Sequence, residues 1–269
     1  MSEINVCPGV VRGELRVQGA KNSVLPLMAA SLLVRGETVL QNCPDLADVD
    51  SAIEILRYLG CRVRRERDAV VIDARGVENW EIPDDMMHRM RSSVIFLGAI
   101  LARTGHARMT YPGGCELGPR PVDMHLAALR RLGARICEED GCITAAASRL
   151  RGAEIALRFP SVGATENALI AATAAEGVTV IRNAAKEPEI SDLVRFLRAA
   201  GCRVAGEGTS VLRVEGGAPV HGAAYRVIAD RIAAGTYLCA AAATGGHVLL
   251  RDCDSAHIAT LCEALAAAG

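Results

Sequence analysis

The sequence predicts an α/β protein built from a repeated unit of strands and helices. Two short phrases recur along the chain, one where helices are expected to end and one where strands are expected to begin. The composition agrees, because 51% of the 269 residues are hydrophobic and the mean hydropathy is +0.23, which is too apolar for a disordered chain. The length suits one large domain or two medium ones.

The first phrase ends a helix at a glycine and then opens a strand. The four glycines lie at positions 60, 133, 201 and 269, with spacings of 73, 68 and 68 residues. Such regular spacing predicts structural repeats. The copies read Leu56-Arg-Tyr-Leu-Gly60-Cys-Arg-Val63, Leu129-Arg-Arg-Leu-Gly133-Ala-Arg-Ile136, Phe196-Leu-Arg-Ala-Ala-Gly201-Cys-Arg-Val204 and Glu263-Ala-Leu-Ala-Ala-Ala-Gly269.

The second phrase places a glycine before an apolar strand and a polar residue after it. It runs from Gly36 to Asn42, from Gly177 to Asn183 and, more loosely, from Gly246 to Asp252. We expect each of these glycines to close a helix in the left-handed conformation. The unit then reads βαβαββ, with copies at about 15–74, 90–147, 155–215 and 225–269, and this alternation predicts sheets covered by helices. The last copy lacks the strand that Gly269 should introduce, so we expect the chain to be cut inside an element.

Basic residues stand where several helices should begin, although the positive end of a helix favours acid. Lys21-Asn22 precedes a helix expected over 23–33, Arg91 opens one over 94–102, and Arg120 opens one ending at Leu132, with Pro121 at its first position. The third copy has the expected Thr165-Glu166 there. Taken alone, each of these basic residues is explained as a solvated surface side chain. Three at equivalent positions indicate a site for a phosphorylated or carboxylated ligand, shared with free backbone N–H groups.

The segment 111–121 contains too many glycines and prolines for a helix or strand, so it is expected to form an exposed loop. Cys115 lies in this loop, five residues before Arg120 and beside a helix start. Such surroundings lower the pKa of a thiol, whereas the neighbouring Glu116 would raise it toward the range useful to a general acid. Cys115 is therefore a candidate reactive thiol, and a passive surface thiol is the alternative.

Charge and composition exclude several classes of partner. The formal net charge is −1 and only 3% of residues are aromatic, so we expect no nucleic-acid partner. The apolar stretches 93–102 and 232–244 are shorter than the roughly 20 residues that span a bilayer, and residues 1–8 do not form a signal peptide. We expect no membrane partner.

Cysteine usage indicates a cytoplasmic protein. The ten cysteines form no CxxC pair, and Cys61, Cys202, Cys239 and Cys262 lie in apolar runs, as small reduced hydrophobes do. We expect no metal site, and neither a dinucleotide-binding fingerprint nor a phosphate-binding P-loop points to a cofactor. Asp230-Arg231 is a plain helix cap or a further site element, and we favour the cap.

Six motifs stand in order along the chain. They are Gly19-Ala-Lys21-Asn22, Met90-Arg91-Ser-Ser, Pro112-Gly-Gly-Cys115 through Asp123, Pro160-Ser161-Val162-Gly163 through Asn167, Asn183 through Ile190, and Asp230-Arg231-Ile. Together they resemble those of the UDP-N-acetylglucosamine 1-carboxyvinyltransferases, the enolpyruvyl transferases that begin peptidoglycan synthesis, and the resemblance covers residues 8–269. The related shikimate-pathway enzyme, which makes enolpyruvylshikimate phosphate, lacks the Gly-Gly-Cys loop and is the second choice.

The resemblance implies the enolpyruvyl-transferase fold, an inside-out α/β barrel. This fold has two domains, each of three βαβαββ units around a pseudo-threefold axis, with the active site between them. Residues 21–229 would form one complete domain that carries the Cys115 loop. Residues 1–20 and 230–269 would begin a second domain whose remainder lies after Gly269.

The resemblance also implies substrates and site residues. Phosphoenolpyruvate would bind Lys21, Asn22 and Arg120, and Cys115 would be the proton donor that fosfomycin alkylates. The sugar 3-hydroxyl would attack C2 of phosphoenolpyruvate while C3 is protonated, and phosphate would then leave. UDP-N-acetylglucosamine would bind Arg91, Arg120, Pro121, Val122, Asp123, Met124, Ser161, Val162 and Gly163.

Three departures from the family pattern affect these expectations. Phe159 replaces a basic residue found in some members, and Ala233 replaces an acid. We expect both replacements to affect substrate affinity more than the type of reaction. The general-base aspartate of the family lies in the units expected after Gly269, so we expect this chain to be inactive alone. The alternatives to an incomplete enzyme are a non-catalytic UDP-sugar-binding module and a repeat scaffold without a ligand, and selective labelling of Cys115 would argue against the scaffold.

Overall fold

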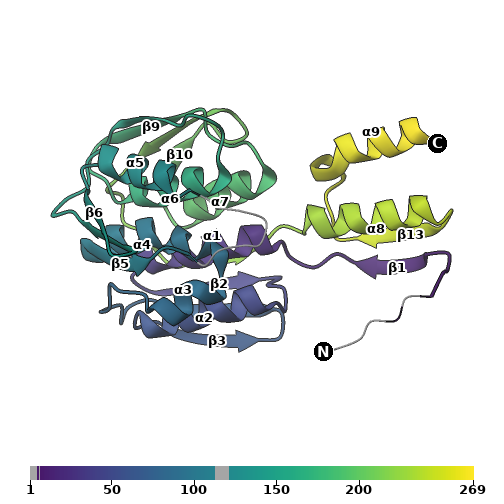
Figure 1. Cartoon of the computed structure of the whole chain (residues 1–269), viewed down its shortest axis with the longest axis horizontal. Helices are drawn as coiled ribbons and strands as arrows, with labels where there is room; N and C mark the ends of the chain where they lie inside the picture. The colour runs from purple at the N-terminus through teal and green to yellow at the C-terminus, as the bar shows by residue number, and fades with distance from the viewer. Residues whose placement is uncertain (1–4, 6, 113–120) are drawn as a thin grey trace. The chain divides into compact units, whose positions relative to one another are not determined.

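The chain forms two compact units. The computed structural model describes residue 5 and residues 7–112 and 121–269. One unit, called the large unit below, spans Lys21–Val227, and the other, the small unit, combines Met1–Ala20 with Ile228–Gly269. Figure 1 shows the elements of both units along the chain.

The first and third copies of the repeat have the same sheet topology in the large unit. In each, the first two strands pair in parallel and the other pairings are antiparallel. This arrangement confirms the βαβαββ unit. The first copy contains β12 (Ala224–Arg226), α1 (Lys21–Ala30), η1 (Ser31–Leu33), β2 (Glu37–Gln41), α2 (Ala47–Tyr58), β3 (Arg62–Glu66) and β4 (Ala69–Asp73), with sheet order β12-β2-β4-β3. The third contains β8 (Glu154–Ala156), α6 (Val162–Thr173), β9 (Val178–Arg182), α7 (Pro188–Ala199), β10 (Arg203–Ala205) and β11 (Val211–Glu215), with sheet order β8-β9-β11-β10.

The middle copy follows the same order with a reduced first strand. Its sheet has the order β5-β7-β6, and the first strand is represented by a parallel bridge between Glu81 and Arg108. The elements are α3 (Asp84–Arg89), η2 (Arg91–Ile95), α4 (Phe96–Thr104), β5 (His106–Thr110), α5 (Asp123–Arg131), β6 (Arg135–Glu139) and β7 (Cys142–Ala146).

The first strands of the first and fourth copies are exchanged. β1 (Arg12–Arg16) pairs in parallel with β13 (His247–Arg251) of the small unit, whereas β12 completes the sheet of the first copy. The expected copies 15–74 and 225–269 are therefore wrong at their starts. Periodicity locates a strand but not its partner, because parallel pairing joins segments that are far apart in sequence. The remaining elements of the small unit are α8 (Arg231–Ala243), η3 (Ser255–Ile258) and α9 (Ala259–Ala268).

The first helix of each copy lies inside the large unit. Every residue from 23 to 30 in α1 and from 164 to 173 in α6 is buried, and α4 packs against both helices. In Figure 1 the sheets containing β2–β3 and β9–β10 lie on opposite sides of α1 and α6. Helices that are apolar on all sides suit such a position. The expected inside-out α/β arrangement, with helices within and sheets outside, is confirmed.

The helix-ending glycines behave as predicted. Gly60, Gly133, Gly201 and Gly269 have φ of 104°, 96°, 94° and 100°, the region that favours glycine. All four follow the second helix of their copies, and Gly60, Gly133 and Gly201 turn the chain toward β3, β6 and β10.

The glycines of the second phrase behave only partly as predicted. Gly177 has φ of 94°, but Gly36 and Gly246 are absent from the positive-φ glycines among the described residues, so the expectation is wrong for them. The left-handed residue shared by all three copies is the polar one that ends the phrase: Asn42, Asn183 and Asp252 have φ of 60°, 55° and 59°. Asparagine and aspartate tolerate this region because their side chains can bond to nearby backbone.

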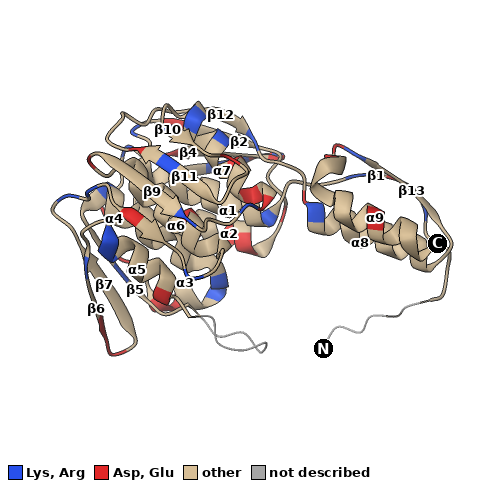
Figure 2. Cartoon of the chain, turned by 90° about the horizontal axis from the view of Figure 1, so that it is seen from above, with Lys and Arg blue, Asp and Glu red and all other residues tan. Residues whose placement is uncertain are grey.

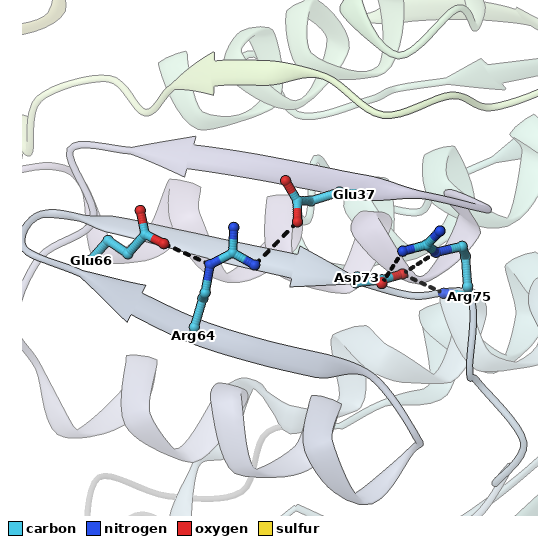
Figure 3. A network of polar contacts seen from close by, with 5 residues as sticks. All are labelled: Glu37, Arg64, Glu66, Asp73 and Arg75. Carbon is cyan, nitrogen blue, oxygen red and sulfur yellow. Dashed lines mark hydrogen bonds and ion pairs between the residues drawn. The ribbon is translucent and has the colours of Figure 1, made fainter.

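The sheet of the first copy carries an exposed polar network. Figure 3 shows Arg64 between Glu37 and Glu66, at 3.2 and 2.6 Å, and Arg75 beside Asp73 at 2.6 Å. Hydrogen bonds from Arg75 lower the pKa of Asp73 to about 2. Exposed pairs of this kind contribute little to stability. Figure 2 shows both signs of charge interspersed along the ribbon.

The cysteines divide between buried and exposed positions. Cys61 and Cys202 are buried as expected, and burial raises their pKa to about 12 and 11. Cys239 and Cys262 are exposed, contrary to expectation. They lie on α8 and α9 of the small unit, whose hydrophobic cluster among the described residues is built on the buried Val17, Ala234 and Ile258. None of the helices in the described segments is long and apolar enough to cross a membrane.

Candidate functional site

The predicted site residues that the structure describes lie at or beside helix starts in the large unit. Lys21 is the first residue of α1, Arg91 of η2, Asp123 of α5 and Val162 of α6. The predicted proton donor Cys115 and the predicted anion-binding Arg120 lie outside the described residues.

The cation at the start of α1 has an acidic partner. Lys21 Nζ lies 2.9 Å from Asp48 Oδ2 in the first turn of α2. The two side chains are 41% and 29% exposed, so solvent screens the pair and it stabilises the fold only weakly. Asp48 offsets the cost of placing a lysine at the positive end of a helix, and Asn22 beside it is exposed. The sequence carries this signal in the acidic first turn of α2, where Asp48 and Asp50 lie.

Ser23, the third residue of α1, fixes the start of the helix from its buried side. Ser23 is fully buried and its hydroxyl donates a hydrogen bond to Asp192 of α7. Tyr225 of β12 donates to the other carboxylate oxygen of Asp192 at 2.6 Å. Asp192 thus connects α1, α7 and the exchanged strand, and it fixes the turn that carries Lys21 and Asn22.

Arg91 begins a short 3-10 helix, whereas the sequence predicted a helix over 94–102. η2 runs directly into α4 at Phe96 and packs against α1 and α6. The Arg91 side chain is half-buried and has no hydrogen bond or ion pair with any residue that the structure describes. Arg91 thus has no described partner and lies on an element that contacts the inner helices α1, α4 and α6.

Pro121 is not the first residue of its helix, so that expectation is wrong. α5 begins at Asp123 after Val122, and Pro121 is exposed two residues earlier. Asp123 supplies the acid that the helix start favours, and it forms an ion pair with the exposed Arg158. The flanking Val122 and Met124 are buried.

The start of α6 offers free backbone donors. The Ser161 hydroxyl caps the helix by accepting from the Ala164 N–H at 3.4 Å, a long bond. The N–H groups of Val162 and Gly163 form no hydrogen bond with the described residues, as is usual in a first turn. An anion placed here would meet two backbone donors and the positive end of the helix.

Thr165 and Glu166 lie deeper in α6 than expected, so they are not first-turn residues. Thr165 Oγ1 donates to the Ser161 carbonyl at 2.7 Å and accepts from the Ala185 N–H at 3.1 Å. Glu166 is 5% exposed, and burial, followed by the charges of Glu189 and Glu187, raises its pKa well above the ordinary value. Burial therefore favours the protonated form of Glu166, which does not offset the helix dipole.

A buried amide joins the starts of α4, α5 and α6, and the sequence analysis missed it. Asn167 Oδ1 accepts from the Gly98 N–H at 2.7 Å, and its Nδ2 donates to the Val94 carbonyl at 2.8 Å. The same Nδ2 lies 2.9 Å from His125 Nδ1. A polar residue inside the alanine-rich run 164–175 was the available signal, because a buried amide needs partners.

The small unit contributes a cap and an uncovered hollow. Asp230 caps α8 by accepting from Ile232 and Ala233 at 2.8 and 3.1 Å, so its side chain has the predicted capping role. A hollow of about 630 Å³ lies between α8 and the η3–α9 segment.

Structural comparison defines the class of protein to which this fold belongs. The enolpyruvyl transferase NikO from Streptomyces tendae matches with a TM-score of 0.75 and 24% identity, covering 84% of this chain and 54% of that one. EPSP synthase from Acinetobacter baumannii matches with a TM-score of 0.68 and 24% identity, covering 91% and 57%. The fold is that of the enolpyruvyl transferases.

The chain belongs to the EPSP synthase (3-phosphoshikimate 1-carboxyvinyltransferase) family, whose sequence profile matches residues 7–269. It is 50% identical over 257 residues to UDP-N-acetylglucosamine 1-carboxyvinyltransferase 2 of Caldanaerobacter subterraneus subsp. tengcongensis, covering 96% of this chain and 62% of the relative. It is 50% identical over 254 residues to UDP-N-acetylglucosamine 1-carboxyvinyltransferase 1 of Symbiobacterium thermophilum, covering 92% and 58%. It is 49% identical over 242 residues to the enzyme of the same name from Desulforapulum autotrophicum, covering 90% and 58%. The chain thus spans about three-fifths of the length of these relatives.

Proposed function

We propose that this protein acts in the transfer of the enolpyruvyl group of phosphoenolpyruvate to the 3-hydroxyl of UDP-N-acetylglucosamine. The observation that carries the proposal is the identity of about half of all residues, over nearly the whole chain, with three relatives named for this activity. The reaction would serve peptidoglycan and cell-wall synthesis in the cytoplasm. The Gly-Gly-Cys loop favours it over transfer to shikimate 3-phosphate.

The proposed chemistry is an addition followed by an elimination. The sugar 3-hydroxyl loses its proton to a general base and its oxygen bonds to C2 of phosphoenolpyruvate while Cys115 gives a proton to C3. The C2–phosphate bond then breaks, a proton leaves C3 and the enol ether double bond forms again. Because carboxylate, phosphate and diphosphate converge, the reaction needs fixed positive groups. Lys21 and Arg120 would meet phosphoenolpyruvate with Asn22 nearby, while the remaining groups would meet the nucleotide sugar: Arg91, residues 120–124 and residues 161–163.

Binding is the direct test, because the relatives extend well beyond the length of this chain. Calorimetric titration of the 269-residue protein with UDP-N-acetylglucosamine should give saturable binding, and shikimate 3-phosphate should not. Saturable binding of shikimate 3-phosphate alone would contradict the proposed substrate.

The proposed role of Cys115 has a separate test. Incubation with fosfomycin should add the mass of one epoxide, mapped to the Cys115 peptide, and Cys115→Ser should abolish the addition. Cys137→Ser is the control because that thiol is exposed on β6, within the described part of the chain. Labelling spread evenly over the exposed cysteines would remove the special role of Cys115.

A further inference from the structure

We infer that His125 is a ligand-binding residue at the start of α6, where its Nε2–H donates to a phosphoryl oxygen, and that Asn167 positions it. This inference rests on the proposed function, which places a nucleotide sugar at the starts of α5 and α6. No motif considered in the sequence pointed to His125. Its role follows from the hydrogen bonds of the amide behind it.

The orientation of the Asn167 amide is fixed by backbone groups. The Gly98 N–H can only donate, so the atom 2.7 Å from it is the amide oxygen. The Val94 carbonyl can only accept, so the atom 2.8 Å from it is the amide nitrogen. No flipped amide satisfies both partners, and the side chain has one arrangement.

This arrangement determines the tautomer of His125. The amide nitrogen of Asn167 has no lone pair to offer, so at 2.9 Å it must donate to His125 Nδ1. Nδ1 therefore carries no proton, and in the neutral ring the proton sits on Nε2. Burial keeps the ring neutral, since it lowers the pKa of His125 to about 4 while the charge of Asp123 opposes the shift only in part.

The donor edge of the ring faces the start of α6. A Cβ atom added to Gly163 would lie 3.0 Å from His125 Cε1 and 3.3 Å from Nε2, so the glycine is needed for this close approach. His125 is only 8% exposed, and its Nε2 has no hydrogen-bond partner in the described part of the chain. Nε2 is not one of the fully buried unpaired atoms of the described residues, so a ligand bound at the helix start can reach this donor and accept its hydrogen bond.

The two features together define the chemistry of the ligand. The free N–H groups of Val162 and Gly163 and the positive end of α6 favour an anionic oxygen. A neutral imidazole adds a third donor without adding charge. This set fits a phosphoryl oxygen, either of the nucleotide diphosphate or of a free phosphate.

The tautomer can be observed directly in the 269-residue protein. A long-range ¹H–¹⁵N spectrum of ¹⁵N-labelled protein, with the ring assigned by loss of its signals in His125→Phe, should show a protonated Nε2 and a bare Nδ1. Addition of UDP-N-acetylglucosamine should move the Nε2 signal. A proton on Nδ1 would overturn the positioning role of Asn167, whether or not any ligand binds.

Affinity measurements test the contact itself. His125→Phe should weaken UDP-N-acetylglucosamine binding about tenfold, the value of one good hydrogen bond to a charged acceptor. His125→Gln, which retains an N–H donor, should recover part of the loss, and the exposed His88→Gln on α3 should have no effect. Inorganic phosphate is titrated in parallel to separate the two sources of the oxygen.

The outcomes distinguish this inference from the proposed function. Binding of UDP-N-acetylglucosamine with unchanged affinity in His125→Phe and an unmoved Nε2 signal would overturn the inference alone. A shift of Nε2 with phosphate but no binding of the nucleotide sugar would contradict the proposed function and leave the oxygen site intact. Absence of binding by both probes would contradict both.

Discussion

Two buried ionisable side chains near the start of α6 respond to pH in opposite directions. His125 is held neutral because burial lowers its pKa to about 4. Glu166 is held neutral because burial and the nearby Glu189 and Glu187 raise its pKa. The fold loses stability wherever the unfolded chain ionises one of these side chains and the folded chain does not. This happens at low pH for His125 and at high pH for Glu166.

The histidine destabilises the fold as the solution becomes acidic. Between its ordinary pKa of 6.5 and about 4, the unfolded chain binds a proton that the folded chain excludes. His125 should therefore cost about 2 kcal/mol of unfolding free energy between pH 7 and pH 5, and about 3 kcal/mol once pH falls below 4.

Urea unfolding at pH 7 and pH 5 measures this loss. In His125→Phe the part of the pH dependence due to this residue should vanish, whereas the exposed His88→Phe should retain it. Equal pH slopes in the parent protein and His125→Phe would show that His125 titrates normally in the fold.

The glutamate destabilises the fold as the solution becomes alkaline. Above its ordinary pKa of 4.5, the unfolded chain releases the Glu166 proton that the folded chain keeps. Glu166→Gln has no proton to release, so it should be more stable than the parent at pH 8. The difference should shrink toward pH 4.5, as thermal midpoints across this range can show.

Glu176→Gln is the matched control for this prediction. Glu176 is exposed just after α6 and pairs with Arg149 on the surface, so its replacement should change stability by less than about 0.5 kcal/mol at either pH. A Glu166→Gln protein that is less stable than the parent at pH 8 would contradict a neutral buried acid.

At the scale of the elements, the close approach of α4 and α6 depends on one glycine. A Cβ at Gly98 would lie 2.4 Å from Asn167 Oδ1 and 2.8 Å from the Asn167 carbonyl oxygen. Gly98→Ala should therefore push the helices apart and disturb the amide that both share. We expect a loss of about 1–3 kcal/mol, measured by urea unfolding.

Gly36→Ala separates this packing effect from the general effect of replacing glycine. A Cβ at Gly36 would find its nearest neighbour at 3.8 Å, an ordinary contact, and the residue does not require a positive φ. Its replacement should be nearly neutral. Similar losses for the two variants would mean that backbone freedom, and not helix packing, dominates at Gly98.

The sequence predicted the elements well and their starts less well. Repetition identified the βαβαββ unit and the four left-handed helix-ending glycines, because both depend on local chemistry. It misplaced the starts of the helices at Pro121 and Glu166 by two to four residues, since caps depend on side chains that fold back on the chain.

Only the charged residues of the candidate site, and those that belong to the recognised motifs, could be predicted from the sequence. Lys21 and Arg91 broke the usual preference at helix starts, and this exception was visible in the sequence. The sequence could not show which groups Asp48, Asn167 and His125 contact, because these contacts join segments more than 25 residues apart. Propensity and periodicity carry no information about such contacts.

At the scale of the whole molecule, the large unit is completed by a strand that comes last in its sequence. β12 pairs in parallel with β2, at positions almost two hundred residues apart along the chain. Its Tyr225 hydroxyl donates to Asp192, and the Val227 carbonyl just after it accepts from Asn42 at 3.0 Å. The strand therefore joins the first and third copies into one closed core.

This closure predicts how fragments of the chain should fold. Residues 21–227 contain every strand and buried helix of the large unit, so this fragment should unfold in one cooperative transition. A fragment of residues 21–215 lacks β12, which exposes the edge of β2 and leaves the buried Asn42 amide without its acceptor. It should be less stable by more than about 2 kcal/mol, because buried polar groups lose their partners together with a strand.

Guanidinium unfolding followed by circular dichroism measures the stability of both fragments. Tyr225→Phe in the longer fragment isolates the contribution of the hydroxyl, with an expected loss of about 1 kcal/mol. Equal midpoints for the two fragments would show that the first copy is stable without the exchanged strand, and that the repeats fold as separate units.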